Sequence, residues 1–531
     1  MGDIFIKLGM IVLFFGVMIA VGFYCRRHSQ SVDGFVLGGR NVGAWFTAFA
    51  YGTSYFSAVI MVGYSGQFGW KYGIASTWIG LGNALIGSYM AWTILGRRTR
   101  VMTQHLHSQT MPDFFLKRYG SRGLKLGAAA IIFVFLIPYA ASLYNGLSRL
   151  FAMAFSVDYT ICIVIMALLT AVYVIAGGYM ATVINDFIQG VIMFFGIIAI
   201  IAAVLRGFGG FQQAVTSLAQ VNDPAVSSAP GAFTSFFGPD LFNLTAVVIL
   251  TSLGTWSLPQ MTQKFYAIKD EQAIMKGTII STLFAVVVAG GCYFMGGFGR
   301  LLSDRVDIAA NGYDSIIPTM FESFSPLLLS LVIVLVLAAS MSTLSSIVLT
   351  SSTTLTLDLI SELRGEKLDE KKQIVYIRGL ILVFIIISAV IAVLQYKYNI
   401  AFIAQLMGLS WGAMAGAFLG PFLYGLYSKR VTVPAVWTSF IFGVGLMLLN
   451  MFAKSAFPVW LQSPINCGAF VMLASLVIVP LVSAVTKAPG KAMVEEIFSC
   501  YELIVTVPAK ASIGYSQNAV PAKRSNRKKK K

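Results

Sequence analysis

A dense stripe of hydroxyl side chains lies in the middle of a strongly hydrophobic segment of this chain, Ala339-Ser-Met-Ser-Thr-Leu-Ser-Ser346. In a helix, positions i, i+3, i+4 and i+7 share one face, and here they are Ala339, Ser342, Thr343 and Ser346, with Ser345 at the border. A hard monovalent cation needs a cage of oxygens, and a membrane helix offers few because its carbonyls are already bonded. The stripe therefore indicates an ion site. The alternative is that these hydroxyls bond to their own backbone or join helices.

One carboxylate, Asp186, is predicted to lie inside a membrane span, near the cytoplasmic end of segment 180–205. Every other acidic residue is expected in a loop, at a helix end or in the C-terminal tail. Burying a carboxylate in lipid is costly, so Asp186 should face a partner or an aqueous cavity. The alternative is a helix cap, because Asp186 lies within about two turns of the helix start.

Two other hydrophobic segments are interrupted by polar and helix-breaking residues. The first contains Tyr51-Gly-Thr-Ser-Tyr-Phe-Ser57, and the second contains Ser252-Leu-Gly-Thr-Trp-Ser-Leu-Pro-Gln260, where Pro259 removes a backbone donor. Paired discontinuous helices in corresponding positions are typical of a transporter's binding site, because unwinding frees carbonyls for a ligand. The alternative is a pair of kinks without functional consequence.

The composition requires an integral membrane protein. Of the 531 residues, 57% are hydrophobic and only 11% are charged. Thirteen segments have the length that a membrane span needs: 4–24, 44–66, 72–95, 126–150, 157–177, 180–205, 241–263, 273–299, 324–355, 375–396, 401–427, 433–453 and 463–486.

The net charge of +17 does not indicate nucleic acid, because the basic residues follow the membrane topology. Most of them, including Lys264 and the tail Lys523–Lys531, fall inside when the N-terminus is outside and the C-terminus is cytoplasmic, as the positive-inside rule requires. We expect a multi-pass protein of the cell membrane. The five cysteines have no metal-site spacing, and no nucleophile or phosphate-binding motif appears, so nothing indicates an enzyme.

Several ordered motifs resemble the sodium:solute symporter family, which includes proline, sialic acid, pantothenate, monocarboxylate and sodium–glucose transporters. The resemblance covers roughly residues 5–485. It rests on Phe35–Gly43, Thr110–Tyr119, Gly177 through Gln189, Pro259-Gln260, the serine stretch, and Gly420-Pro421 through Lys429-Arg430.

The resemblance implies an all-α fold with a core of five plus five inverted-repeat helices, in which the first helix of each repeat is discontinuous. The expected organisation is a first helix and inner loop (1–43), the first repeat (44–205), an outer loop (206–240), the second repeat (241–428), two peripheral spans (429–486) and a basic cytoplasmic tail (487–531).

The resemblance also implies the coupling ion, Na+, and its ligands; it implies no organic cofactor. The common sodium site would use the carbonyls of Thr53, Phe56 and Ala339 and the hydroxyls of Ser342 and Thr343. Thr53 and Phe56 are not the usual side chains there, which a carbonyl ligand tolerates. Some family members have a second sodium site, and its residues are matched here by Asp186, Ser342, Ser345 and Ser346.

The solute is less closely defined by these motifs. Tyr139 matches an aromatic residue that lines the proline transporters' site, Ser57 and Gln260 lie at the two breaks, and Trp256 is expected to gate the pocket. Met407 and the apolar third span argue against a sugar, and Thr251 replaces the tryptophan of the proline type. We expect a small carboxylate-bearing solute, either an amino acid such as proline or an organic acid.

The leading hypothesis is therefore sodium-coupled import of a small solute by alternating access. One alternative is proton coupling through Asp186 on the same fold. Another is a membrane sensor with a transporter-like core. The partners expected are the solute and the lipid bilayer.

Overall fold

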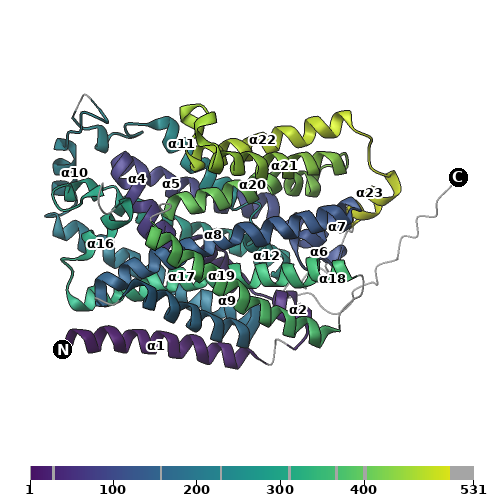
Figure 1. Ribbon diagram of the computed structural model, residues 1–531, viewed down its shortest axis with the longest axis horizontal. Helices are drawn as coiled ribbons and strands as arrows, with labels where there is room; N and C mark the ends of the chain where they lie inside the picture. The colour runs from purple at the N-terminus through teal and green to yellow at the C-terminus, as the bar shows by residue number, and fades with distance from the viewer. Residues whose placement is uncertain are drawn as a thin grey trace, which may run out of the picture.

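The computed structural model describes residues 2–26, 30–155, 158–227, 230–308, 312–364, 369–398 and 403–502. Within these ranges the regular structure is helical, and strand-like pairing is limited to one isolated bridge between Val42 and Ile268. The long helices run side by side in one bundle (Figure 1). We call its two ends the α10 end, with the start of α1, and the α7 end, with α6, α18 and α23.

The first half of the bundle consists of α1 (Gly2–Cys25), α2 (Val32–Leu37), α3 (Ala44–Tyr55), η3 (Val59–Tyr64) with α4 (Ser65–Tyr72), α5 (Thr77–Gly82) continuing through η5 (Asn83–Met90) and η6 (Trp92–Gly96) into α6 (Arg97–His105), α7 (Met111–Tyr119), α8 (Arg122–Phe155), α9 (Tyr159–Gly207) and α10 (Phe211–Gln220). Short 3-10 turns are η2 (Gly38–Arg40), η4 (Gly73–Ser76) and η7 (Ala232–Thr234).

The second half consists of α11 (Leu241–Gly254), α12 (Pro259–Ala267), α13 (Glu271–Ala285) with η8 (Val286–Gly290) and α14 (Gly291–Gly296), α16 (Ile316–Phe321), α17 (Pro326–Thr354) with η11 (Leu355–Ile360) and α18 (Ser361–Arg364), α19 (Glu370–Tyr398), α20 (Ile403–Tyr427), α21 (Val433–Phe452), α22 (Pro464–Val485) and α23 (Lys491–Phe498). The remaining short turns are η9 (Gly299–Leu302), η10 (Tyr313–Ser315), η12 (Lys454–Ala456), η13 (Val459–Leu461) and η14 (Ser499–Tyr501).

The prediction of a polytopic helical membrane protein is confirmed. In the described residues, 11 helical runs are long and apolar enough to cross a membrane. Two of these runs hold more than one expected span. The run Tyr159–Gly207 is broken at Gly178, where φ is 59°, and Val59–His105 joins half of the second span to the third. These two runs account for the difference from the thirteen segments read in the sequence.

Both expected helix breaks are present. The helix α3 ends at Tyr55, Phe56 is extended, and the chain resumes helical structure towards α4. The helix α11 ends at Gly254, and α12 begins at Pro259, whose missing N–H costs nothing in the first turn. Beyond the first break, α4 packs directly on α14, because a Cβ atom on Gly69 would lie 1.9 Å from the carbonyl oxygen of Gly296.

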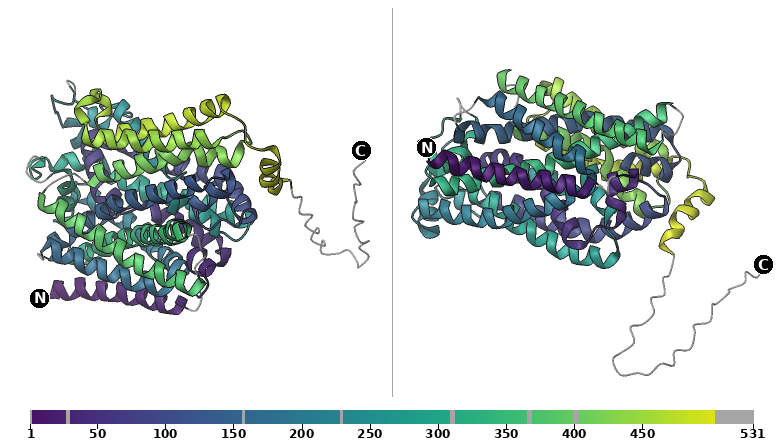
Figure 2. Two further views of the ribbon diagram at one scale, coloured as in Figure 1. Left: turned by 45° about the vertical axis from the view of Figure 1, so that its right-hand side comes forward. Right: turned by 90° about the horizontal axis from the view of Figure 1, so that it is seen from below.

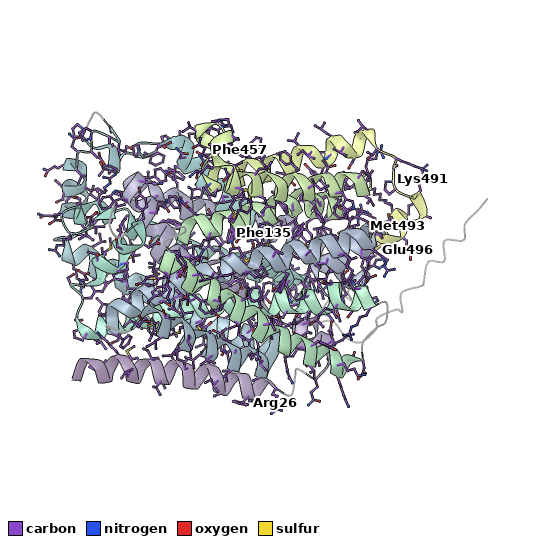
Figure 3. The ribbon with its side chains drawn as sticks, viewed as in Figure 1. Arg26, Phe135, Phe457, Lys491, Met493 and Glu496 are labelled. Carbon is purple, nitrogen blue, oxygen red and sulfur yellow. The ribbon has the colours of Figure 1, made fainter. Side chains whose placement is uncertain are left out.

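The helix α17 lies at the centre of the bundle and packs against α3, α8, α9 and α12. The helix α1 runs along one side, with α21 and α22 on the opposite side (Figure 2). Phe135 of α8 lies in the interior, whereas Lys491 and Glu496 lie at the α7 end (Figure 3). Both broken helices are therefore among the helices that pack around α17.

The first part of the segment 487–531 is helical and packs on the bundle. In η14, the Tyr501 hydroxyl donates to the carbonyl of Arg98 at 3.1 Å, and the Arg98 guanidinium lies over the Tyr501 ring. The basic run Lys523–Lys531 lies outside the described residues.

Candidate functional site

The end of α3 meets the hydroxyl stripe of α17. The Thr343 hydroxyl lies 3.0 Å from the Thr53 carbonyl and 3.4 Å from the Phe56 carbonyl, and the Ser342 hydroxyl lies 3.2 Å from the Thr53 carbonyl. The last carbonyls of a helix have no partner in their own helix, so the break at Tyr55 supplies these acceptors.

The Ala339 carbonyl completes this group, at 3.1 Å from the Ser342 hydroxyl and 3.2 Å from that of Thr343. The structure therefore brings together all five residues that the sequence assigned to the common sodium site, and each of them is buried. Neutral oxygens from two helices form a donor set that suits a hard monovalent cation. The two hydroxyls would have to rotate so that their lone pairs, and not their hydrogens, face the ion.

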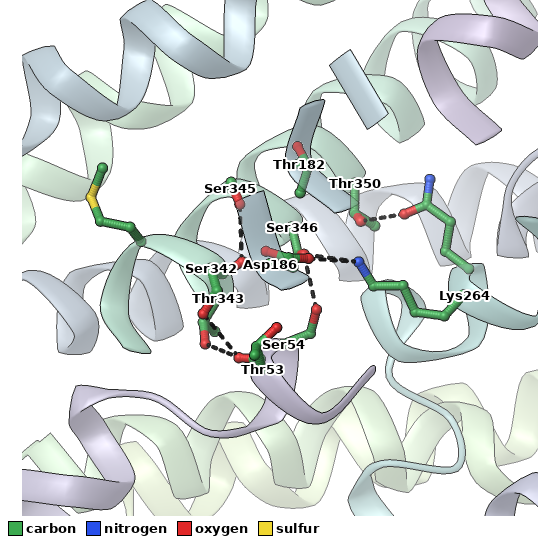
Figure 4. A network of polar contacts seen from close by, with 12 residues as sticks. Thr53, Ser54, Thr182, Asp186, Lys264, Ser342, Thr343, Ser345, Ser346 and Thr350 are labelled. Atoms are coloured by element: carbon green, nitrogen blue, oxygen red, sulfur yellow. Dashed lines mark hydrogen bonds and ion pairs between the residues drawn. The ribbon is translucent and has the colours of Figure 1, made fainter. Parts of the chain in front are cut away.

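Asp186 faces a lysine that the sequence analysis placed in an inner loop. The Lys264 ammonium, on α12, lies 3.5 Å from Asp186 Oδ2 and 3.1 Å from the Ser346 hydroxyl (Figure 4). Both charged side chains are at most 1% exposed. Asp186 lies well inside α9, so the helix-cap alternative does not fit. Lys264 was expected just beyond the span 241–263, but α12 continues to Ala267 and buries it inside the bundle.

Two other serines connect this pair to the α3–α17 contact. The Ser346 hydroxyl lies 3.0 Å from the Ser54 hydroxyl on α3. The Ser345 hydroxyl donates to the Ser342 carbonyl at 3.0 Å, so it is bonded within its own helix (Figure 4). Asp186 and Ser346 therefore share Lys264, whereas Ser345 does not bond to it.

The residues assigned to the solute carry buried polar groups. Ser57, Tyr139 and Gln260 are fully buried. Within the described residues both amide atoms of Gln260 lack a hydrogen-bond partner, whereas the Tyr139 hydroxyl faces the Ser57 hydroxyl and the Trp411 indole. Leaving buried polar groups unpaired is costly, and native proteins seldom do so. Buried polar groups from both helix breaks are thus gathered in one region of the bundle.

Trp411 of α20 connects the two breaks, and the sequence analysis did not identify it. The Tyr139 and Tyr55 rings lie 5.9 and 6.0 Å from it, and a Cβ atom on Gly254 would lie 2.6 Å from its ring. Its indole N–H faces the Tyr139 hydroxyl. The sequence feature that could have identified Trp411 is a tryptophan in the middle of a span, flanked by Ser410 and Gly412.

Trp256, which we expect to gate the pocket, is hydrogen-bonded to the third span. Its indole N–H donates to the Ile86 carbonyl at 2.9 Å, and the neighbouring Thr255 hydroxyl donates to the Gly87 carbonyl at 2.8 Å. These bonds attach the second break to η5 of the third span.

Two cavities lie at opposite ends of the bundle, and neither is lined by Ser57, Tyr139 or Gln260. One of about 1090 Å³ lies at the α10 end and is lined by residues that include Gln67, Trp70, Arg300 and Asn466. One of about 570 Å³ lies at the α7 end. Because Ser57, Tyr139 and Gln260 are fully buried, side chains close the central site from both cavities.

A second buried acid, Asp358, lies at the α7 end, although the sequence analysis identified only Asp186. The helix containing α17 continues beyond the expected limit at 355 and carries Asp358 inward. Asp358 accepts a hydrogen bond from Thr110 at 2.6 Å and lies 3.5 Å from the Lys125 ammonium, which also contacts Glu362 at 3.2 Å. This inner ionic cluster (Thr110, Lys125, Asp358, Glu362) joins α7 and α8 to η11 and α18.

The two discontinuous helices around a buried polar centre define a membrane transporter of small solutes. This chain belongs to the sodium:solute symporter family, whose model matches residues 35–443. It is a sodium-coupled solute symporter and not an enzyme.

Curated relatives and solved structures agree with this family. The osmoregulated proline transporter of Bacillus subtilis is 27% identical, covering 92% of this chain and 96% of that protein. The sodium/proline symporter of Staphylococcus aureus is 27% identical, covering 91% and 93%. A sodium-coupled sialic acid symporter, solved in a substrate-bound outward-open state, superimposes with a TM-score of 0.72 at 16% identity, covering 92% of this chain and 99% of that one. The expected transporter fold is thereby confirmed; the repeat limits 44–205 and 241–428 stay a prediction.

The inner ionic cluster gives a stability prediction. Lys125→Met leaves Asp358, which is 1% exposed, without its cation, and we expect a loss of roughly 3–5 kcal/mol of stability. Arg122→Gln is the matched control, since Arg122 also contacts Glu362 but is 69% exposed, and it should cost less than about 1 kcal/mol. Melting temperatures in one detergent compare the two, and equal shifts would contradict a structural role for the buried pair.

Proposed function

We propose that this symporter imports a small carboxylate-bearing solute, such as proline or another amino or organic acid, together with sodium. The observation that carries the proposal is the pair of breaks around Tyr139 and Trp411, where Ser57 and Gln260 gather buried polar atoms and, in the described residues, both amide atoms of Gln260 lack a partner. The names of the two curated relatives add proline as the first compound to test.

The charge of the site suits an anionic group. A sodium ion at the common site would place a positive charge beside the break of α3. The helix α12 begins at Pro259 and directs its positive dipole end towards the same centre, where Gln260 is in its first turn. A solute carboxylate would therefore be compensated without a basic side chain in direct contact.

Sodium and solute are coupled, in this proposal, through the end of α3. The ion would bind the carbonyls of Thr53 and Phe56 and hold them against Ser342 and Thr343. Fixing Phe56 also fixes the following residue, Ser57, which faces the solute. Sodium would thus favour the solute-binding state, and the sodium gradient would drive import. The common-site ligands are Thr53, Phe56, Ala339, Ser342 and Thr343.

For the orientation, we propose that the α10 end is outside and the α7 end is cytoplasmic, in the cell membrane. Basic residues concentrate on α6 and α7 at that end, among them Arg97, Arg98, Arg100, Lys117 and Arg118. This distribution follows the positive-inside rule.

Uptake of radiolabelled L-proline into proteoliposomes tests the function. An inward sodium gradient should drive accumulation, whereas an inward proton gradient in sodium-free buffer should not; the reverse result would favour the proton-coupled alternative. If proline is not accumulated, a panel of amino and organic acids, screened by sodium-dependent thermal stabilisation, identifies the solute. A protein that accumulates none of them would support the sensor alternative.

The sodium ligands are tested by Ser342→Ala/Thr343→Ala. Bonds to a charged group are worth about 1.5–3 kcal/mol each, so the sodium concentration for half-maximal uptake should rise at least about tenfold. Ser340→Ala is the matched control, because its hydroxyl bonds to the Val336 carbonyl of its own helix. Thr53→Ala should have a mild effect, since only its carbonyl is involved. Unchanged sodium dependence in the double variant would reject the assignment.

The solute residues are tested by Tyr139→Phe and Gln260→Ala. Each should weaken solute binding by about tenfold if the lost group bonds to a carboxylate, and each should leave sodium binding in the absence of solute unchanged. Tyr424→Phe is the control, because the Tyr424 hydroxyl bonds to the Leu476 carbonyl between α20 and α22. If the affinity for solute is unchanged in both variants, the solute pocket lies elsewhere.

A further inference from the structure

An apolar hollow of about 290 Å³ lies between α11 and the helical run formed by α5 and η5, which pack against each other. We call it the lateral groove. Its lining includes Trp78, Gly82, Leu85, Ile86, Thr245 and Val248. The two walls belong to the candidate membrane spans Val59–His105 and Leu241–Ala267. Leu85 and Leu241 line the groove and are each more than half exposed, so it opens on the surface that faces lipid.

The groove is shaped by a close approach of its two walls. A Cβ atom on Gly82 would lie 2.5 Å from Val248 Cγ1, so α5 and α11 meet there without an intervening side chain. From Leu241 to Val248 the groove follows α11 for about 10 Å, at the ~1.5 Å rise of a helical residue. It begins near the α10 end, because η7, which precedes α11 in the chain, packs against α10. One leaflet of a ~30 Å hydrocarbon core is about 15 Å deep, so the groove spans most of a leaflet.

The groove offers a ligand no free polar atom within the described residues. Two of its lining side chains have a polar atom, and both atoms are already bonded. The Trp78 indole N–H donates to the Phe236 carbonyl at 2.8 Å, and the Thr245 hydroxyl donates to the Leu241 carbonyl of its own helix at 2.8 Å. A carboxylate or an amine would be desolvated here without a partner, whereas a hydrocarbon chain loses no hydrogen bond. The groove therefore suits a lipid acyl chain.

The wall formed by η5 is bonded to both helix breaks. The carbonyl of Ile86, which lines the groove, accepts from the Trp256 indole at 2.9 Å, and the carbonyl of Gly87 accepts from Thr255 and from Tyr51 at 2.8 Å each. Tyr51 lies on α3 just before the first break, and Thr255 and Trp256 lie in the second. A ligand that packs on Ile86 therefore acts on the backbone that joins the two breaks.

We propose that the lateral groove binds one acyl chain of a membrane lipid, and that the bound chain stabilises η5 and through it both helix breaks. The chain would fill the hollow and supply the packing contacts that its lining lacks. The carbonyls of Ile86 and Gly87 would then stay in place for Trp256 and Thr255. Lipid would be a positive effector of this transporter, at a site separate from those proposed for sodium and solute.

Photo-crosslinking tests the site in the full-length protein. The probe is a phosphatidylcholine with a diazirine in one acyl chain, added to phosphatidylcholine vesicles that contain the protein. The wild type should be labelled preferentially in residues 77–87 and 241–248. Thr245→Phe places a ring in the groove and should reduce that labelling at least about fivefold, because the ring and the chain compete for one space. Thr93→Phe is the matched control and should match the wild type, since Thr93 is an exposed threonine of η6 whose hydroxyl also bonds to its own helix.

Hydrogen–deuterium exchange tests the connection to the breaks, with protein in detergent before and after phosphatidylcholine is added. Exchange in residues 83–90 and 252–260 should slow in the wild type and in Thr93→Phe. Lipid should have no effect on these segments in Thr245→Phe. If that variant does not fold, Leu85→Trp replaces it, because Leu85 is exposed and lines the same groove.

Each outcome decides one part of the proposal. Labelling spread evenly over the lipid-facing helices, or undiminished in Thr245→Phe, would overturn the acyl-chain site. A labelled groove with unchanged exchange in residues 252–260 would overturn the connection to the second break. A groove labelled in monomeric but not in dimeric protein would assign it to a second copy of this chain and would also overturn the proposal. Neither measurement uses sodium or solute, so the result is independent of the proposed function.

Discussion

The structure depends on one contact between α3 and α17. The break in α3 leaves backbone carbonyls without a partner in their own helix, and hydroxyl groups of α17 donate hydrogen bonds to them. In a continuous membrane helix these carbonyls would be bonded internally, and in lipid they would be costly to leave unpaired. Here Ser342 and Thr343 meet the carbonyl of Thr53 within 3.2 Å. This contact joins the break of α3 to α17, and its oxygens are the ones that we propose to bind sodium.

Fixed charges inside the bundle impose the second constraint. Two unit charges about 4 Å apart interact by about 4 kcal/mol at an effective dielectric constant of 20. A buried acid therefore needs a cationic partner, and an additional cation would need an acid that is not already paired. Asp186 is paired with Lys264 near the centre, and Asp358 with Lys125 near the α7 end. The first pair lies beside the proposed common site, and the second lines the cavity at the end that we propose to be cytoplasmic.

Sequence patterns predicted the parts of this site that depend on local structure. The hydroxyl stripe follows from helical periodicity, and both breaks follow from glycine, proline and polar residues in apolar segments. Lys264 was misplaced because charge counting treats a lysine after an apolar run as a loop residue, whereas α12 extends to Ala267. Trp411 and Asp358 were missed for a related reason, since their roles depend on which helix each faces, and one sequence holds no record of tertiary contacts.

Hydrogen–deuterium exchange of the backbone amides around the α3 break, residues 53–61, tests the central claim most directly. We expect slower exchange in sodium than in potassium at equal ionic strength, because sodium would order the carbonyls of Thr53 and Phe56 against α17. The difference should disappear in Ser342→Ala/Thr343→Ala. Equal exchange in sodium and potassium, in a protein whose uptake requires sodium, would contradict an ion site between α3 and α17.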